Sequence, residues 1–297
     1  MGTPEFAVES LKILVENKYN IVAVITAPDR PKGRGQKLSI SPVKEYAMTQ
    51  NIPILQPTNL KSPDFNEELK SYNANLQVVV AFRMLPEVVW AMPEYGTFNL
   101  HASLLPQYRG ASPINWAIMN GETETGVTTF FIKHEIDTGS VILQEREPIL
   151  ETDNVGSLYQ RLMEKGATIV LKTVEQIKDQ SYELKVQDES GGLKHAPKLF
   201  KEDCEVNWSG SSKQIYDFVR GLSPYPAAWT TFNGKTFKIF GIQIAEKSMT
   251  GNIGSVQSNG KDEILVKTGD GVVSVLDLQL QGKKRMLTID FLRGNSI

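Results

Sequence analysis

The sequence predicts a doubly wound α/β domain followed by a small β-barrel domain. In the first part of the chain, short apolar runs alternate with segments of helical periodicity, a pattern typical of a parallel sheet covered by helices. After residue 203 the chain changes to brief β-rich runs separated by Asn-Gly and Asp-Gly turns, which is typical of a small barrel. We therefore place the α/β domain at residues 1–182, a linker at 183–202 and the barrel at 203–297.

The individual elements follow from periodicity, capping residues and turn residues. Strands are expected at residues 21–26, 52–55, 76–82, 97–103, 128–133 and 140–144, and in the barrel at 228–232, 236–242, 264–267 and 272–280. Helices are expected at residues 6–15, from 42, at 63–72, 114–120, about 154–178 and 211–220. Ser112 before Pro113 fits an N-cap, and Gly121 fits the residue that ends a helix. Residues 179–200 are polar and contain Gly191-Gly192 and Pro197, which is typical of a linker.

Composition limits the classes of function. The 297 residues carry a formal net charge of −2, so any contact with nucleic acid must come from local basic patches. A single cysteine, Cys204, excludes an intrachain disulfide and favours a reducing compartment. There is no signal peptide and no apolar run near 18 residues, so we expect a cytoplasmic protein with no membrane partner.

The strongest functional pattern is the polar pair in the strand expected at residues 97–103. Asn99 and His101 share one face of that strand, because side chains two apart point the same way, while Phe98 and Leu100 face the core. A buried polar group without a partner costs about 1–3 kcal/mol, so such a pair needs a reason. The strand ends before Pro106, and the carboxyl ends of strands are where open α/β sheets bind ligands.

The run Asn-x-His-x-Ser-Leu-Leu-Pro-x-Tyr-Arg-Gly at residues 99–110 resembles the folate-dependent formyltransferases. Asp137, in His-Glu-Ile-Asp-Thr-Gly at residues 134–139, matches the third catalytic position of that family. The resemblance covers the whole chain and is strongest to the members that act on methionyl initiator tRNA. It implies a Rossmann-like catalytic domain and a C-terminal OB-like domain that binds tRNA.

This resemblance also implies a strand ahead of the turn Gly2-Thr3-Pro4. Met1 stands at the last position of that strand, so we expect the first strand to be missing. Because the strand would be central in the sheet, its loss should lower stability while leaving the active site in place.

The resemblance implies that Asn99 polarises the formyl oxygen, that His101 stabilises the intermediate and handles protons, and that Asp137 acts on His101 and the amine. Formyl transfer to an amine creates an oxyanion, and each hydrogen-bond donor aimed at it is worth about 10²–10³ in rate. A group that takes the amine proton is worth about 10²–10⁴. An Asn amide donates without titrating, and histidine exchanges protons near pH 7. The microscopic proton assignment between His101 and Asp137 stays open at this stage.

Residues 78–86 resemble the segment that shapes the pterin pocket of the family. A pterin needs a flat apolar slot with backbone donors and acceptors, which the backbone of Arg83, Met84 and Leu85 could supply. A buried strand running into a helix explains the same apolar residues equally well. The further cofactor-binding candidates are Ser103, Leu104, Leu105 and Pro106. The implied co-substrate is 10-formyltetrahydrofolate, and no metal is expected because the histidines lack His-Glu-x-x-His spacing.

Two basic segments are candidates for tRNA contact. A glycine-rich loop at residues 27–37 resembles the loop that meets the acceptor end of initiator tRNA in the family, and it lacks the spacing of a P-loop. Its candidate phosphate contacts are Arg30, Lys32, Arg34 and Lys37. The second segment is Lys283, Lys284 and Arg285, which an ordinary basic turn explains equally well.

We expect a monomeric enzyme that moves the formyl group of 10-formyltetrahydrofolate to the amino group of methionyl initiator tRNA. A sugar-nucleotide N-formyltransferase with the same three residues is the alternative enzyme, and a noncatalytic RNA-binding module is the alternative of another class. A hydrolase built on Ser103, His101 and Asp137 is disfavoured. The sequence has no Gly-x-Ser-x-Gly elbow, and side chains two residues apart rarely form a triad.

Overall fold

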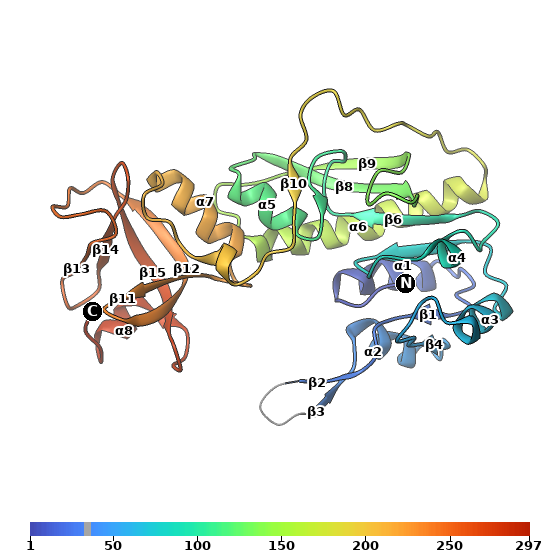
Figure 1. Cartoon of the computed structure of the whole chain (residues 1–297), viewed down its shortest axis with the longest axis horizontal. Helices are drawn as coiled ribbons and strands as arrows, with labels where there is room; N and C mark the ends of the chain where they lie inside the picture. Colours follow the sequence, from blue (N-terminus) through green and yellow to red (C-terminus); the bar gives the residue numbers. More distant parts are fainter. Residues whose placement is uncertain (33–36) are drawn as a thin grey trace. The chain divides into compact units, whose positions relative to one another are not determined.

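The computed structural model describes residues 1–32 and 37–297, drawn in Figure 1. The chain forms two compact units whose segments interleave along the sequence. Unit 1 comprises Met1–Arg109, Gly126–Glu147 and Tyr159–Lys194, and unit 2 comprises Gly110–Thr125, Pro148–Leu158 and His195–Ile297. The simpler division at residues 182 and 203 stays a prediction.

Unit 1 is built on an α/β sheet, as the sequence predicts. Strands β1 (Val24–Ile25) and β4 (Ile54–Leu55) pair in parallel. Strands β5 (Gln77–Val80), β6 (Thr97–His101), β8 (Glu124–Phe131) and β9 (Val141–Pro148) follow in the order β5-β6-β8-β9. Strands β5 and β6 are parallel, whereas β6 and β8 are antiparallel. The apolar runs predicted the right strands but overstated the length of β1 and β5, because only the residues that find a partner strand join a ladder.

Helices cover this sheet. They are α1 (Phe6–Glu16), α2 (Pro42–Thr49), α3 (Pro63–Ser71), α4 (Glu87–Trp90) and α6 (Val155–Lys178). Ser41 caps α2 by accepting a hydrogen bond from the Lys44 backbone at 3.1 Å, as its sequence context indicates. In Figure 1, α6 runs along one face of β6, β8 and β9, and the Thr129 and Thr173 hydroxyls bond at 2.8 Å across this contact. The sheet that carries the candidate site is therefore backed by a long helix.

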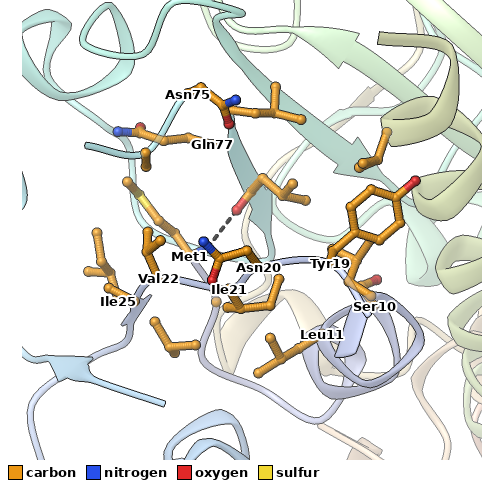
Figure 2. Close-up of a pocket in the computed structure, with 18 of the residues that line it drawn as sticks. Met1, Ser10, Leu11, Tyr19, Asn20, Ile21, Val22, Ile25, Asn75 and Gln77 are labelled. Carbon is orange, nitrogen blue, oxygen red and sulfur yellow. Dashed lines mark hydrogen bonds between the residues drawn. The ribbon is translucent and has the colours of Figure 1, made fainter. Parts of the chain in front are cut away.

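The space between β1 and β5 is occupied at one end only, by Met1 and Gly2. The Gly2 N–H donates to the carbonyl of Ile25 at 3.0 Å, and the Val80 N–H donates to the carbonyl of Met1 at 2.9 Å. The Met1 amine itself donates to the carbonyl of Val78 at 2.5 Å, the dashed line in Figure 2. Beyond this point a cavity of about 760 Å³ separates the two strands.

This cavity is large enough for a short segment of extended chain, and Figure 2 shows apolar side chains such as Leu11, Ile21 and Val22 around it. Next to the cavity, burial by the surrounding protein lowers the pKa of the Met1 amine from 8.0 to about 5. The absence of a family strand at this place stays a prediction.

Unit 2 contains a curled antiparallel sheet with helices α5 (Pro113–Met119), α7 (Ser212–Leu222) and α8 (Thr288–Leu292). The strands are β11 (Ala228–Phe232), β12 (Lys235–Ala245), β15 (Val272–Leu280), β14 (Ile264–Lys267) and β13 (Val256–Ser258), in that spatial order, with β16 (Met286–Leu287) paired to β15. Asn233 and Gly234 have φ of 47° and 72°, which makes the β11–β12 hairpin turn that the Asn-Gly pair predicts. The structure confirms the small β domain as an open, half-barrel sheet.

Some local expectations differ from the structure. Ser112 makes no side-chain cap for α5, because its φ of −134° and ψ of 49° are not the extended conformation a cap needs. The hairpin of β2 (Arg30–Lys32) and β3 (Lys37–Ser39), in the predicted basic loop, was not expected. Other unpredicted elements are β7 (Arg109–Gly110), β10 (His195–Ala196) and the 3₁₀ helix Glu202–Cys204.

Candidate active site

Strand β6 places Asn99 and His101 on one face, and its two neighbours fix their register. Asn99 lies opposite Val79 of β5 and Phe130 of β8, and His101 lies opposite Thr128. The alternate residues Phe98 and Leu100 are buried in the core. Within the described chain no hydrogen bond is found for the Asn99 side-chain amide, so its donors remain available to a ligand.

The ring of His101 is held in one orientation. Its Nε2 lies 2.8 Å from the backbone carbonyl oxygen of Tyr108. A carbonyl can only accept, so Nε2 carries the hydrogen and the other ring nitrogen, Nδ1, holds a lone pair when the ring is neutral. Nδ1 faces the Asp137 carboxylate, with 3.8 Å between Nδ1 and Oδ2. Nδ1 is therefore the nitrogen that can take and return a proton at this site.

Hydrogen bonds to the turn after β6 fix the Tyr108 carbonyl. The Ser103 hydroxyl donates to the Gln107 carbonyl at 2.6 Å, and the Tyr108 N–H donates to the Lys194 carbonyl at 2.6 Å. Tyr108 itself has a φ of 60°, in the left-handed region. The turn thus presents the Tyr108 carbonyl toward the imidazole.

Some of the predicted folate residues of this turn already form hydrogen bonds within the protein. Ser103 is fully buried with its hydroxyl bonded as above, and Leu105 is buried with its carbonyl bonded by Gln144 at 3.0 Å. Leu104 and Pro106 are half-buried. Contact of these four residues with folate stays a prediction.

Asp137 lies in the turn between β8 and β9, and its side chain is 11% exposed against 7% for His101. Its φ of 56° is in the left-handed region, which disfavours a residue with a Cβ. Two residues later, a Cβ on Gly139 would lie 1.6 Å from the Phe131 carbonyl oxygen, so only glycine fits. The turn is therefore tight, and Gln187 donates two hydrogen bonds to its backbone.

Gln187 and Arg109 are the residues that sequence reasoning missed. The Gln187 amide donates to the backbone carbonyls of Asp137 and Gly139, and Arg109 donates to the Gln187 side-chain oxygen. Arg109 stood inside the recognised motif without a role. Gln187 lay in a polar stretch whose composition is that of a linker, so no pattern in the sequence pointed to it.

The predicted pterin segment follows β5 at the same sheet edge as Asn99 and His101, because β5 and β6 are parallel and in register. Met84 is 74% exposed and Ile136 of the Asp137 turn is 62% exposed, whereas Leu85 packs in the core. Among the described residues, the backbone N–H groups from Phe82 to Leu85 have no backbone acceptor. Exposed apolar side chains next to available backbone donors fit a flat heteroaromatic ring.

The Arg83 side chain, in contrast, is tied to the loop after β4. Its guanidinium donates to the carbonyls of Pro57 and Thr58, the latter at 3.0 Å, and lies 5.6 Å from the centre of the Phe82 ring. Its bulk is thus turned onto that loop, and only its backbone fits the predicted folate role.

The base of the β2–β3 hairpin is held by Asp29. Lys44 and Gln56 donate to its carboxylate at 2.5 and 2.7 Å, and the hydrogen bond from Lys44 is the main reason that its pKa lies below the usual value. Arg30 is exposed on this hairpin, and the backbones of Lys32 and Lys37 pair across it. Arg34 lies outside the described residues. The predicted tRNA contacts of these four cations stay predictions.

In unit 2, the three residues of the second predicted basic segment differ in their contacts. Lys283 and Lys284 are exposed. Arg285 makes a forked ion pair with Asp277, with an Nη2–Oδ2 distance of 2.6 Å, and stacks 4.2 Å from the centre of the Phe240 ring. The hydrogen bonds that Arg285 donates to Asp277 raise the pKa of Arg285 above its ordinary value. A phosphate would therefore have to compete with this carboxylate.

The described residues contain neither a candidate metal-binding cluster nor a candidate membrane-spanning helix. Between residues 1–32 and 37–297, no three His, Cys, Asp or Glu side chains gather in a way that could hold a metal ion. No helix in this part of the chain has the length and apolarity needed to cross a membrane.

An amide donor and an oriented imidazole near the carboxyl end of β6, with the carboxylate of the β8–β9 turn beside them, are the kinds of group that transfer through an oxyanion requires. Family models agree with this class. Residues 1–174 match the formyl transferase model, and residues 198–296 match the model of the formyl transferase C-terminal domain. The chain belongs to the formyl transferase family.

Named relatives cover almost the whole chain. A Bacteroides thetaiotaomicron protein named methionyl-tRNA formyltransferase is 54% identical over 302 residues, covering 99% of this chain and 94% of the relative. A Phocaeicola vulgatus protein of the same name is 56% identical over 304 residues, with 99% and 94% covered.

Solved structures share the fold at lower identity. WlaRD, a sugar 3N-formyl transferase crystallised in the presence of dTDP and 5-N-formyl-THF, aligns with a TM-score of 0.68 at 22% identity over 95% of this chain and 97% of that one. HypX from Aquifex aeolicus in complex with tetrahydrofolic acid aligns with a TM-score of 0.61 at 23% identity, over 84% and 43%. At these identities the likeness shows the fold alone.

Proposed function

We propose that this protein transfers the formyl group of 10-formyltetrahydrofolate to the amino group of methionyl initiator tRNA. The observation that carries the proposal is the arrangement on β6, where the lone pair of His101 Nδ1 faces Asp137 and Asn99 lies on the same strand face. The names of relatives at 54% and 56% identity over nearly the full length support the choice of acceptor.

In this mechanism each residue has a separate task. The co-substrate supplies a formyl carbon bound to its leaving nitrogen. Asn99 donates its amide N–H to the formyl oxygen, where negative charge develops as the methionyl amine attacks. His101 Nδ1 takes the amine proton as the new N–C bond forms, and returns it to the leaving nitrogen as the old C–N bond breaks. Asp137 stabilises the imidazolium in between, since its carboxylate lies 3.8 Å from Nδ1.

The remaining predicted site residues are part of the proposal. Folate binds along the backbone of Arg83, Met84 and Leu85 and against the turn Ser103, Leu104, Leu105 and Pro106. The tRNA backbone binds to Arg30, Lys32, Arg34 and Lys37 and to Lys283, Lys284 and Arg285. The protein acts as a monomer, and it acts in the cytoplasm because its acceptor is an aminoacyl-tRNA.

The test is a comparison of acceptors with labelled 10-formyltetrahydrofolate. Methionyl initiator tRNA, uncharged initiator tRNA and an amino-sugar nucleotide are offered separately to the purified protein. We expect label only on the methionine released by alkali from the charged tRNA. Preferred labelling of the sugar nucleotide would favour the alternative enzyme. Binding of uncharged RNA without turnover on any acceptor would favour the noncatalytic module.

A further inference from the structure

Gln187 lies in an extended segment after α6 that runs beside β9. Lys185 exchanges two backbone hydrogen bonds with Val141, at 2.8 and 2.9 Å, so this part of the segment continues the sheet. Gln187 follows two residues later and is 9% exposed. A buried glutamine must satisfy both ends of its amide, and here both ends are satisfied by the active-site surroundings.

The donors of Gln187 hold the Asp137 turn. Its Nε2 donates to the carbonyl of Asp137 at 2.7 Å and to the carbonyl of Gly139 at 2.8 Å. Both acceptors belong to backbone that cannot rearrange freely, because Asp137 is in the left-handed region and Gly139 packs on the Phe131 carbonyl. One side chain thus bridges the two residues that flank the bend.

The acceptor of Gln187 faces Arg109, which fixes the orientation of the amide. Arg109 donates to Oε1 from Nε at 3.1 Å and from Nη2 at 2.7 Å. The Arg109 side chain is mostly buried, and its Nη2 also pairs with Glu189, whose side chain is exposed. A guanidinium can only donate, so the amide oxygen must point toward it and the amide nitrogen toward the turn.

Arg109 is also the residue after Tyr108, whose carbonyl holds His101 Nε2. A continuous path of contacts therefore runs from the imidazole, through Tyr108 and Arg109, to Gln187 and the backbone of Asp137. Both partners of the Nδ1–Oδ2 contact are attached to this path.

We infer that Gln187 is a positioning residue that keeps the Asp137 carboxylate opposite His101 Nδ1, with Arg109 orienting the Gln187 amide. The inference rests on the proposed function for the role of Asp137. Without the two hydrogen bonds from Nε2, the turn loses two contacts to its disfavoured backbone, and the carboxylate moves away from the imidazole. A misplacement of about 1 Å at a catalytic group can cost roughly 10²-fold in rate.

The test compares Gln187→Ala and Gln187→Glu with the matched control Glu189→Ala. Glu189 contacts the same arginine but not the turn. The Gln187→Glu side chain can still accept a hydrogen bond from Arg109, but it has no N–H to donate to the two carbonyls. This variant therefore tests the hydrogen bonds to the turn separately from the contact with Arg109. We expect both Gln187 variants to lower kcat by roughly 10–100-fold with KM for both substrates nearly unchanged. Glu189→Ala should stay near the wild-type value.

A double variant shows whether Gln187 acts through Asp137 or through the stability of the structure as a whole. In an Asp137→Ala background, adding Gln187→Ala should lower kcat no further, because Gln187 acts through Asp137. Hydrogen exchange of the amides at residues 136–140 should be faster in both Gln187 variants than in Glu189→Ala. Additive losses in the cycle, a wild-type kcat for Gln187→Glu, or unchanged exchange would overturn the inference. If the wild type forms no formylmethionyl-tRNA, the proposed function is wrong. The exchange measurement still shows whether Gln187 holds the turn at residues 136–140.

Discussion

In a chain that begins at Met1, the buried amine of this residue makes the free energy of unfolding depend on pH in a defined window. Burial lowers the pKa of this amine from 8.0 to about 5. Below pH 5 the amine is charged in both states, and the folded state carries the cost of burying that charge. Between about pH 5 and 8 the unfolded chain still binds the proton while the folded chain does not, so stability rises with pH. Above pH 8 the amine is neutral in both states, so burial of its charge no longer lowers the free energy of unfolding.

The size of this contribution follows from the two pKa values. The difference between 8.0 and about 5, at about 1.4 kcal/mol for each tenfold change, corresponds to about 4 kcal/mol. That is a large share of the ~5–15 kcal/mol by which a typical protein is stable. A marginal chain should therefore unfold much more easily at pH 5.5 than at pH 8.

The assay is urea unfolding at several pH values between 5 and 8, on chains whose intact Met1 is verified by mass spectrometry. The comparison protein is the same chain acetylated at Met1, which has no titratable amine while all its other groups are the same. The difference between the two proteins in free energy of unfolding should change by about 3 kcal/mol from pH 5 to pH 8, because the amine is half-titrated in one of the two states at each end of this range. Parallel pH curves for the two proteins would refute the burial of this amine.

Three further predictions follow from the site and the fold. Asn99→Ala and Asp137→Ala should each lower kcat by about 10²-fold or more while urea unfolding stays cooperative. Turnover and urea unfolding measured on the same protein samples check this. A few apolar residues added ahead of Met1 should raise Tm by filling the cavity of about 760 Å³, and an unchanged Tm would mean that the cavity does not accept a strand. Arg34→Ala should weaken the use of charged tRNA but not folate affinity, and it should make turnover less sensitive to salt; equal salt slopes would remove the loop from tRNA recognition.

The sequence predicted best those features that depend on local chemistry. The bounds of β11, β14 and β15 agree with expectation, because each is a short run of β-prone residues that begins and ends next to turn residues. Asn99 and His101 could be identified because a polar pair on an apolar strand is unusual and belongs to a long motif. The lengths of β1 and β5 could not be predicted, since they depend on which neighbouring backbone is present to pair with them.

Contacts between segments that are distant in the sequence could not be predicted from sequence patterns. Gln187 is 50 residues from Asp137 and stands in a polar stretch, so its bonds to the turn follow only from the tertiary structure. Arg285 was predicted to be a phosphate contact because of its basic neighbours. Its ion pair with Asp277 depends on the pairing of β15 with β16, which charge alone does not show.

The central claim is that His101 moves the amine proton during formyl transfer to charged tRNA. The most direct measurement is single-turnover formylation of methionyl initiator tRNA by the wild type and by His101→Ala, with both proteins saturated in 10-formyltetrahydrofolate. The account predicts formylmethionyl-tRNA from the wild type and a rate at least about 10²-fold lower from the variant. A near-normal rate for His101→Ala would contradict it.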